Sequence, residues 1–180
     1  MRVITGTARG RKLRALPGDD VRPTTDIVKE AMFSIIQFEL EGRRVLDLFA
    51  GSGQLGIEAL SRGAENAVFV DSSKNSLEVI NENIQAAGFA ASSEVVLSDA
   101  IGYLVRSPKT FDIAIVDPPY KAGLMNKALE ALIPHMAKGS VIICETADAE
   151  KLPSEVSDFT GKRYRYGKTA LTVYRRSENL

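Results

Sequence analysis

Short apolar runs alternate with amphipathic stretches along the chain from residue 44 onward. Runs rich in Val, Ile and Leu are typical of parallel strands buried on both faces, and the stretches between them are typical of covering helices. The pattern predicts strands at Arg44–Ala50, Asn66–Asp71, Ser93–Ser98, Phe111–Asp117 and Gly139–Glu145. It predicts helices near Leu55–Arg62, Lys74–Ala87, Ala100–Ser107 and Leu124–Ala137.

The last part of the chain has a different pattern. Phe159–Tyr166 and Thr169–Arg176 contain tyrosines and β-branched residues, and Gly167-Lys168 separates them. A two-residue connection with glycine between such runs predicts an antiparallel hairpin. We therefore expect an α/β fold with a seven-stranded mixed sheet, made of the five parallel strands and this C-terminal hairpin.

The first 40 residues precede this alternation. Arg2–Thr7 and Lys12–Leu16 predict a short basic β-hairpin, and a helix with Thr24 or Thr25 as its cap follows. One apolar stripe at helical spacing in this helix is expected to pack against the core: Ile27, Ala31, Ile35 and Phe38. We expect a small extension (1–40) packed on a main domain (41–180).

A formal net charge of zero conceals two basic ends. Residues 1–18 carry no acid but contain Arg2, Arg9, Arg11, Lys12 and Arg14. Residues 161–176 also carry no acid and contain Lys162, Arg163, Arg165, Lys168, Arg175 and Arg176. Basic runs of this kind indicate a polyanionic partner, and solvated surface charge is the alternative that the sequence leaves open.

Composition excludes several other classes of protein. No stretch approaches the roughly 18–20 apolar residues of a membrane span, and the opening MRVITGTARGRKL lacks the apolar core of a signal peptide, so we expect a cytoplasmic protein without membrane contact. The single Cys144 cannot form an internal disulfide. With one histidine, His135, neither a zinc site nor a histidine-based triad is expected.

A glycine-rich segment, VLDLFAGSGQLGIEAL (45–60), ends the first predicted strand and begins a helix. Gly51, Gly53 and Gly56 satisfy the G-x-G-x-x-G spacing, which also fits a dinucleotide-binding unit. Asp47 precedes the turn, where its charge disfavours a pyrophosphate and favours a ligand with a cation, such as the ammonium group of a methionine moiety. The turn and the start of the helix can then take the carboxylate of that moiety.

Two further acids follow the next predicted strands. Asp71 lies 20 residues after Gly51 and is well placed to bind two ribose hydroxyls. Asp99 can accept a hydrogen bond from an exocyclic adenine amine, or it can cap the following helix. Because the carboxyl ends of parallel strands meet at one edge of a sheet, we expect Asp47, Asp71 and Asp99 to line a single ligand-binding edge.

The segment VDPPYKAGL (116–124) follows the fourth predicted strand. Two consecutive prolines supply no backbone donors, so they form a rigid turn with unpaired carbonyls. Beside a carboxylate, these carbonyls can accept hydrogen bonds from an amine on which positive charge develops, and an aromatic ring can stack on a planar base. The residues expected to act in catalysis are Asp117, Pro118, Pro119 and Tyr120.

Together, DLFAGSGQLGIEAL and DPPY resemble the amino-group methyltransferases. The segments GTARGRKL, RPTTDIVKEAMFSII and YGKTALTVYRR are similar to those of the bacterial 16S rRNA (guanine(966)-N(2))-methyltransferase family, and the resemblance extends from Arg2 to Arg176. It implies the Rossmann-like class I methyltransferase fold and S-adenosylmethionine (SAM) as cofactor. It also implies methylation of a guanine N2 in 16S rRNA, within the small ribosomal subunit or an assembly intermediate, and no metal. The base must leave its stack to react.

The resemblance also implies which residues bind each ligand. The expected cofactor-binding residues are Asp47, Phe49, Ala50, Gly51, Gly53, Asp71, Ser72, Asp99 and Ala100. The expected RNA-binding residues, through phosphate contacts, are Arg9, Arg11, Lys12 and Arg22. Asn83, in the segment NENIQAAG, also resembles the family pattern. An asparagine on a helix face, however, is more often solvated or structural. We expect a monomer.

Several alternatives stay open at this point. An NAD(P)-linked oxidoreductase shares the glycine-rich turn and Asp71, but Asp47, DPPY and the absence of a hydride-relay histidine argue against it. A non-catalytic RNA-binding module is disfavoured by the intact Asp117, Pro118 and Tyr120. Adenine N6 of nucleic acid and protein glutamine are rival substrates because both present planar amino groups. The segment Arg22-Pro23-Thr24 could cover the cofactor or contact RNA.

Overall fold

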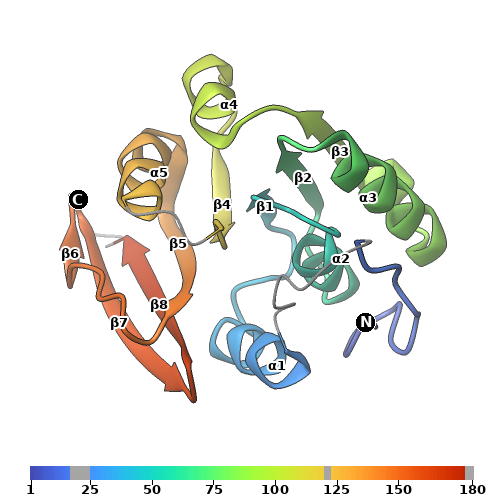
Figure 1. Ribbon diagram of the computed structural model, residues 1–180, viewed down its shortest axis with the longest axis horizontal. Helices are drawn as coiled ribbons and strands as arrows, with labels where there is room; N and C mark the ends of the chain where they lie inside the picture. Colours follow the sequence, from blue (N-terminus) through green and yellow to red (C-terminus); the bar gives the residue numbers. More distant parts are fainter. Residues whose placement is uncertain (17–24, 120–122, 177–180) are drawn as a thin grey trace.

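The computed structural model of the chain describes residues 1–16, 25–119 and 123–176. Its centre is an eight-stranded sheet in the order β3-β2-β1-β4-β5-β8-β7-β6, with helices on both faces (Figure 1). The strands are β1 (Arg44–Leu48), β2 (Asn66–Asp71), β3 (Ser93–Leu97), β4 (Phe111–Val116), β5 (Met136–Ala147), β6 (Glu155–Val156), β7 (Phe159–Tyr166) and β8 (Thr169–Arg176). The helices are α1 (Asp26–Ile35), α2 (Gln54–Ser61), α3 (Lys74–Ala87), α4 (Ala100–Arg106) and α5 (Leu124–Leu132), with 3₁₀ turns at Ala90–Ser92 and Ile133–His135.

The predicted mixed α/β sheet is confirmed. Strands β1 to β5 pair in parallel, and β8 pairs antiparallel with both β5 and β7. The hairpin closes at Gly167, whose φ of 63° suits the tight turn between Tyr166 and Thr169. The sheet has one strand more than predicted, because the two residues of β6 add to the edge of β7.

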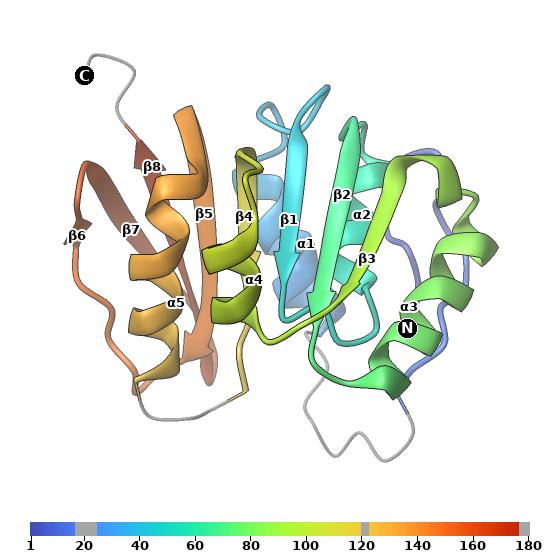
Figure 2. The same ribbon diagram turned by 90° about the horizontal axis from the view of Figure 1, so that it is seen from above.

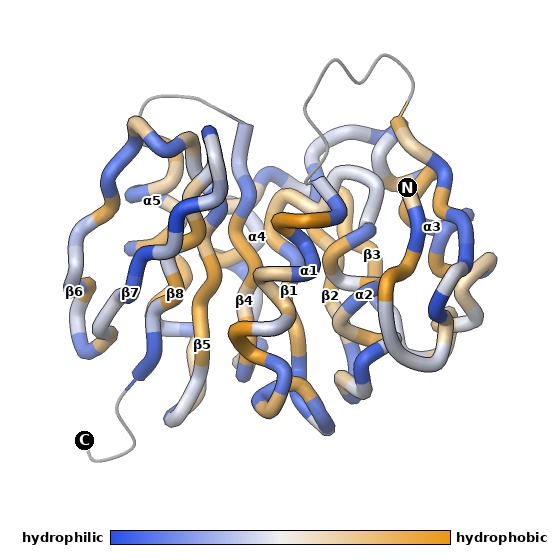
Figure 3. Tube along the Cα trace, turned by 90° about the horizontal axis from the view of Figure 1, so that it is seen from below, coloured by the Kyte–Doolittle hydropathy of each residue, from blue (hydrophilic) through white to orange (hydrophobic). Residues whose placement is uncertain are grey.

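Two apolar layers cover the sheet. Helices α1, α2 and α3 pack on one face through a cluster that includes Met32, Ile57 and Ile80. Helices α4 and α5 pack on the other face through a cluster that includes Leu104 and Leu129. Apolar residues therefore run along the central strands in Figure 3, as buried parallel strands require.

The strand order reverses between β1 and β4. From β1 the chain proceeds to β2 and β3 on one side, and β4 and β5 lie on the other. Figure 2 shows the arrowheads of β1 and β2 pointing to the same edge of the sheet. In open sheets of this kind, ligands bind outside the carboxyl ends of the strands at the point of reversal.

The element boundaries depart from prediction where the backbone demands it. Strand β1 ends at Leu48 rather than Ala50, because Phe49 has a φ of 76° and leaves the extended region. Helix α5 ends at Leu132 instead of Ala137, since Pro134 lacks an amide donor and the chain tightens into a 3₁₀ turn. Strand β5 accordingly begins at Met136, before the predicted Gly139.

The predicted N-terminal hairpin is present but shorter than predicted. In the N-terminal segment (residues 1–16), the antiparallel bridge between Arg2 and Lys12 is flanked by backbone hydrogen bonds from the Val3 amide to the Arg11 carbonyl and from the Leu13 amide to the Met1 carbonyl, both at 3.0 Å. The amides of Ile4 and Thr5 instead donate to the Glu58 carboxylate of α2, at 2.8 and 3.0 Å. After Val3, the Glu58 side chain of the main domain thus replaces the cross-strand partners that a longer hairpin would supply.

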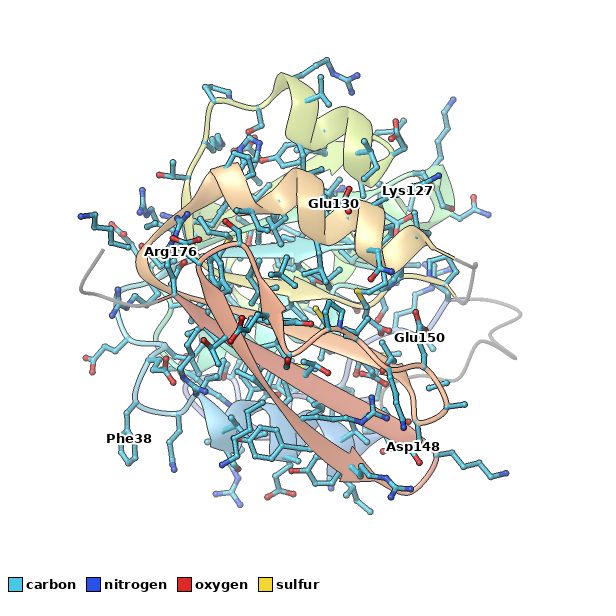
Figure 4. All side chains as sticks on the ribbon, turned by 90° about the vertical axis from the view of Figure 1, so that its left-hand side faces the viewer. Phe38, Lys127, Glu130, Asp148, Glu150 and Arg176 are labelled. Atoms are coloured by element: carbon cyan, nitrogen blue, oxygen red, sulfur yellow. The ribbon has the colours of Figure 1, made fainter. Side chains whose placement is uncertain are left out.

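The packing predicted for the first helix is wrong at Ile27 and Phe38, whereas Ile35 is partly buried against the core as predicted. Thr25 does cap α1, accepting a hydrogen bond from the amide of Val28 at 3.3 Å. The buried face, however, is formed by Val28, Lys29, Met32, Phe33 and Ile36. Of the predicted stripe, Ile27 is 73% and Phe38 94% exposed, and Phe38 projects from the body in Figure 4. The helix carries two apolar stripes, and spacing alone does not say which of them meets the sheet.

Gly6 provides a test of how the N-terminal segment is held. A Cβ atom at Gly6 would lie 1.7 Å from the Ser61 carbonyl oxygen, whereas one at Gly10 would meet nothing within 4 Å. Both residues have positive φ, 89° and 81°, so both alanine variants carry similar backbone strain. Gly6→Ala should lower the free energy of unfolding by roughly 2–4 kcal/mol and Gly10→Ala by about 1 kcal/mol. Urea denaturation measures both, and equal losses would contradict close docking on α2.

Candidate functional site

The glycine-rich turn (Phe49–Gly53) lies between two other strand ends. Leu48 pairs with Val70 of β2 on one side and with Val116 of β4 on the other. The residues that follow these three positions, including Asp71 and Asp117, therefore emerge side by side. The fold thus brings Asp71, predicted to bind the cofactor, and Asp117, predicted to act in catalysis, to one edge of the sheet.

The turn has a fixed backbone. The amides of Phe49 and Ala50 both donate to the Val70 carbonyl, at 3.1 and 2.9 Å, and the Gly53 amide donates to the Ala50 carbonyl at 2.7 Å. A Cβ atom at Gly51 would meet nothing within 4 Å, so the space above this residue is open. Phe49 is held at a positive φ, which a bulky residue rarely adopts and which is often found at functional sites.

Asp47 is the buried acid of the site, with 2% of its surface exposed. Its Oδ2 accepts a hydrogen bond from the Gly56 amide at 2.9 Å, in the first turns of α2. Burial raises the pKa of Asp47 to about 7; the Gly56 hydrogen bond opposes this rise and the charge of Asp71 adds to it. A carboxylate in this state is strongly stabilised by a cation placed nearby.

Asp71 already binds the backbone around it. Its Oδ2 accepts from the Gly51 amide and its Oδ1 from the Ser73 amide, both at 2.9 Å. Each oxygen has a second lone pair, so the carboxylate can still accept hydrogen bonds from a ligand. These contacts tie the end of β2 to the glycine-rich turn and leave the neighbouring Ser72 exposed.

Asp99 caps helix α4, which is one of the two roles that the sequence predicted for it. Its Oδ1 accepts from the Gly102 amide at 2.7 Å at the start of α4, and the side chain is exposed. Ala100, the next residue, is buried. The cap uses one oxygen, and no described residue donates to the other, so capping and ligand binding are compatible.

The Asp-Pro-Pro turn follows β4 directly. Asp117 is half-buried, Pro118 is buried and Pro119 is exposed. Tyr120 and Arg22, predicted for base stacking and RNA binding, lie outside the described residues, as do Pro23 and Thr24. Of the two polar or aromatic side chains predicted to act in catalysis, Asp117 therefore has a described position, and it follows the strand beside the glycine-rich turn.

The two basic ends differ in how their charges are used. Four of the six basic residues near the C-terminus form ion pairs: Arg163 and Arg165 with Asp148, Arg175 with Glu39, and Arg176 with Asp158. Arg9, Arg11 and Lys12, in contrast, are exposed and form no ion pair with any described residue. They line a hollow of ≈ 460 Å³ in the N-terminal segment. The N-terminal segment therefore carries positive charge that is not neutralised by ion pairs with described residues.

Another hollow, of ≈ 550 Å³, lies at the opposite edge of the sheet, where the strands begin. Its cations are already paired, Arg44 with Asp112 and Lys109 with Glu94. The open space above Gly51 and the strand-end acids are absent there. Among the described residues, no group of three or more His, Cys, Asp or Glu side chains could hold a metal ion. No described helix has both the length and the apolarity needed to cross a membrane.

The contact of Asn83 with the glycine-rich turn was not predicted from the sequence. This residue of α3 is 2% exposed, and its side chain donates to the carbonyl of Ser52 in the glycine-rich turn at 2.9 Å. It also exchanges two hydrogen bonds with the backbone of Arg14. The position of Asn83 in the apolar period of α3, four residues after Val79, was the available signal that it faces inward.

Comparison with known proteins agrees with this geometry. The "Putative rRNA methyltransferase YlbH" of Bacillus subtilis (strain 168) is 39% identical over 183 residues, covering 98% of this chain and 99% of that protein. The "Ribosomal RNA small subunit methyltransferase D" of Escherichia coli (strain K12) is 32% identical over 179 residues, covering 98% of this chain and 90% of that protein.

A solved structure described as "Putative methyltransferase yhhF from Escherichia coli" superposes with a TM-score of 0.88 at 31% identity, covering 99% of both chains. The expected class I methyltransferase fold is therefore confirmed. The match to a family described as "Conserved hypothetical protein 95" spans residues 1–175. The chain therefore belongs to this family, and it is also similar to two curated proteins named as ribosomal RNA methyltransferases.

Proposed function

We propose that this protein is a SAM-dependent methyltransferase that methylates the exocyclic N2 of a guanine in 16S rRNA, guanine 966 by family resemblance. The observation that carries the proposal is the pairing of Leu48 with Val116, which brings the Asp117-Pro118-Pro119 turn beside the glycine-rich turn. The names of the relatives support ribosomal RNA as the substrate class. A monomer acting in the cytoplasm is part of the proposal, as is the division into an extension (1–40) and a main domain (41–180).

The residues around the glycine-rich turn fit SAM. Buried Asp47, with its raised pKa, suits the ammonium group, and Asp71 retains lone pairs for the ribose hydroxyls. The second oxygen of Asp99 suits the adenine amine. The open space above Gly51 allows a ligand to approach the backbone. The other residues proposed to bind the cofactor are Phe49, Ala50, Gly53, Ser72 and Ala100. When bound, SAM supplies an electrophilic methyl group on a sulfonium.

The role of the Asp-Pro-Pro turn follows from the chemistry of an aromatic amine. The nitrogen lone pair of guanine N2 is delocalised into the ring. As the nitrogen–methyl bond forms, the bond between the methyl group and the sulfonium sulfur breaks, positive charge develops on the nitrogen, and one of its protons is then lost to solvent. The Asp117 carboxylate and the Pro118 carbonyl can accept hydrogen bonds from its two protons. Because the prolines make the turn rigid, these acceptors need not reorganise during the reaction, which is how preorganised electrostatic stabilisation works.

The N-terminal segment is proposed to hold the RNA. Arg9, Arg11 and Lys12 are exposed cations without ion pairs to described residues, so they are available for phosphates. Arg22 is included in this proposal from the sequence alone. The C-terminal basic run is a weaker candidate, since four of its six basic side chains already form ion pairs with Asp148, Glu39 and Asp158.

Direct mapping of the product tests the proposal. The protein is incubated with methyl-labelled SAM and with 16S rRNA or small-subunit particles from cells that lack this enzyme, and the digested RNA is analysed by mass spectrometry. We expect N2-methylguanosine at one position. Label on adenine N6 or on a protein glutamine would point to the rival amino-group substrates, and binding of NAD rather than SAM would point to an oxidoreductase.

Asp117→Ala should cut turnover by about 10²-fold or more and leave the affinity for SAM nearly unchanged. The reason is that the substitution removes an acceptor for charge that develops in the transition state. Single-turnover methylation and calorimetric SAM titration measure the two effects separately. Normal turnover with weakened SAM binding would show that Asp117 belongs to the cofactor site instead.

The raised pKa of Asp47 makes cofactor affinity depend on pH. In the protein without ligand, the folded state retains a proton that the unfolded state loses, so the contribution of Asp47 to stability falls as the pH rises from about 4 to about 7. A bound ammonium group favours the ionised carboxylate. The affinity for S-adenosylhomocysteine should therefore rise by about tenfold between about pH 6 and about pH 8. Asp47→Asn should remove this dependence of affinity on pH. If calorimetry gave the same pH dependence for the wild type and the variant, the ammonium group would not bind beside Asp47.

Replacing Arg9, Arg11 and Lys12 by Ala should weaken RNA binding and reduce the slope of log affinity against log salt by about 2–3. In a matched control variant, three other exposed cations, Lys127, Lys138 and Lys151, are replaced by Ala. The two variants then have the same net charge. Filter binding over a salt series compares the two variants. Equal slopes would show that only net charge matters and that this segment is not the RNA contact.

A further inference from the structure

We propose that Asn83 is a positioning residue whose side chain holds the glycine-rich turn and the N-terminal segment in one fixed geometry, so that its loss weakens cofactor and RNA binding together. The inference rests on the proposed function, which assigns these two parts of the chain to the two ligands. Asn83 itself touches neither ligand in this proposal and acts through the backbone that it holds.

The side chain of Asn83 is fully used within the protein. Its Oδ1 accepts from the Arg14 amide at 2.7 Å, and its Nδ2 donates to the Arg14 carbonyl at 3.0 Å and to the Ser52 carbonyl at 2.9 Å. Both amide hydrogens and the carbonyl oxygen are thereby paired. With 2% of the residue exposed, water cannot readily replace these partners if the side chain is removed.

The bond to Ser52 fixes the centre of the glycine-rich turn. The Ser52 carbonyl and the Gly53 amide belong to one planar peptide group. Asn83 holds the carbonyl side of this plane, and the Ala50 carbonyl holds the amide side at 2.7 Å. The flanking Gly51 and Gly53 both have positive φ, 57° and 78°, and glycine adopts many other conformations when it is not restrained. Asn83 therefore restricts the part of the turn that has the greatest intrinsic freedom.

The bonds to Arg14 hold the chain just after Arg9, Arg11 and Lys12, the exposed cations of the N-terminal segment. Both backbone groups of Arg14 are paired with Asn83. The chain before these cations is held by Glu58, whose carboxylate accepts from the amide of Thr5. The loop of unpaired cations is thus anchored on both sides. One of these two anchors is the same side chain that restrains the glycine-rich turn.

Other contacts join the same two parts of the chain. Ser52 donates from its hydroxyl to the sulfur of Met1 at 3.2 Å. The buried Lys29 donates to the Arg2 carbonyl at 2.6 Å and to Gln54, the first residue of α2, at 3.4 Å. The N-terminal segment is therefore linked to the glycine-rich turn through Ser52 and to the start of α2 through Lys29. Asn83 differs from these residues because it bonds to both parts directly, through their backbones.

The test measures two affinities of the folded protein, for S-adenosylhomocysteine by calorimetry and for an unmethylated 16S rRNA transcript by filter binding. Asn83→Ala should weaken each by about tenfold. Asn81→Ala is the surface control, since Asn81 is exposed on the same helix and donates only to the Leu77 carbonyl. Val79→Ala is the stability control, because it opens a cavity at a buried position of α3 and removes no hydrogen bond to either part.

Each outcome decides the matter. Loss of both affinities in Asn83→Ala, beyond any loss in Val79→Ala, supports the inference. Affinities within about twofold of the wild type, or losses equal to those of Val79→Ala, would overturn it and leave the proposed function standing. A wild-type protein that binds neither probe would refute the proposed function and this inference with it.

A second pair of variants serves if Asn83→Ala does not fold. Arg14→Pro removes the amide that donates to Asn83, and Arg14→Ala keeps this amide while removing the same side chain, which pairs with Glu82. RNA binding that is at least about fivefold weaker in Arg14→Pro than in Arg14→Ala supports the inference. Equal RNA binding by the two variants would overturn it.

Discussion

In a parallel sheet, the residues that follow two neighbouring strands come together without any contact between their side chains, and the pairing of β1 with β4 has this effect here. Leu48 and Val116 lie opposite each other at the point where the strand order reverses. A one-residue change in this register would move the Asp-Pro-Pro turn relative to the glycine-rich turn and would exchange the faces on which the strand side chains lie. The chemistry proposed for Asp117 depends on this register more than on any interaction of the side chain itself.

The electrostatic design of the site follows from where the acids are buried. Asp47 lies in the interior and is energetically unfavourable as an isolated anion, and its pKa is raised accordingly. Asp71 and Asp99 lie nearer the surface and are stabilised by backbone amides of the following turns. One edge of the sheet thus offers one poorly compensated carboxylate and two well-supported ones. This suits a ligand that carries a cation at one end and hydroxyl and amine donors at the other.

Most of the site could be predicted from the sequence, because strand ends are local features and parallel strands align them. The features that sequence missed depend on long-range partners. The exposed stripe of Ile27 and Phe38 is as regular as the buried one, and only the sheet distinguishes them. The C-terminal arginines are neutralised by acids such as Asp148, which no local pattern connects to them. The N-terminal hairpin is shorter than predicted because the amides of Ile4 and Thr5 donate to Glu58, a partner more than 50 residues away.

A structure determined with S-adenosylhomocysteine bound would test directly whether the glycine-rich turn and the Asp-Pro-Pro turn form one site. We expect the ribose against Asp71, the ammonium group towards Asp47, and the sulfur facing the side of Asp117. Binding in the hollow at the other edge of the sheet, beside Arg44 and Lys109, would contradict it. So would a complex in which the ligand occupies the glycine-rich turn with its sulfur directed away from Asp117.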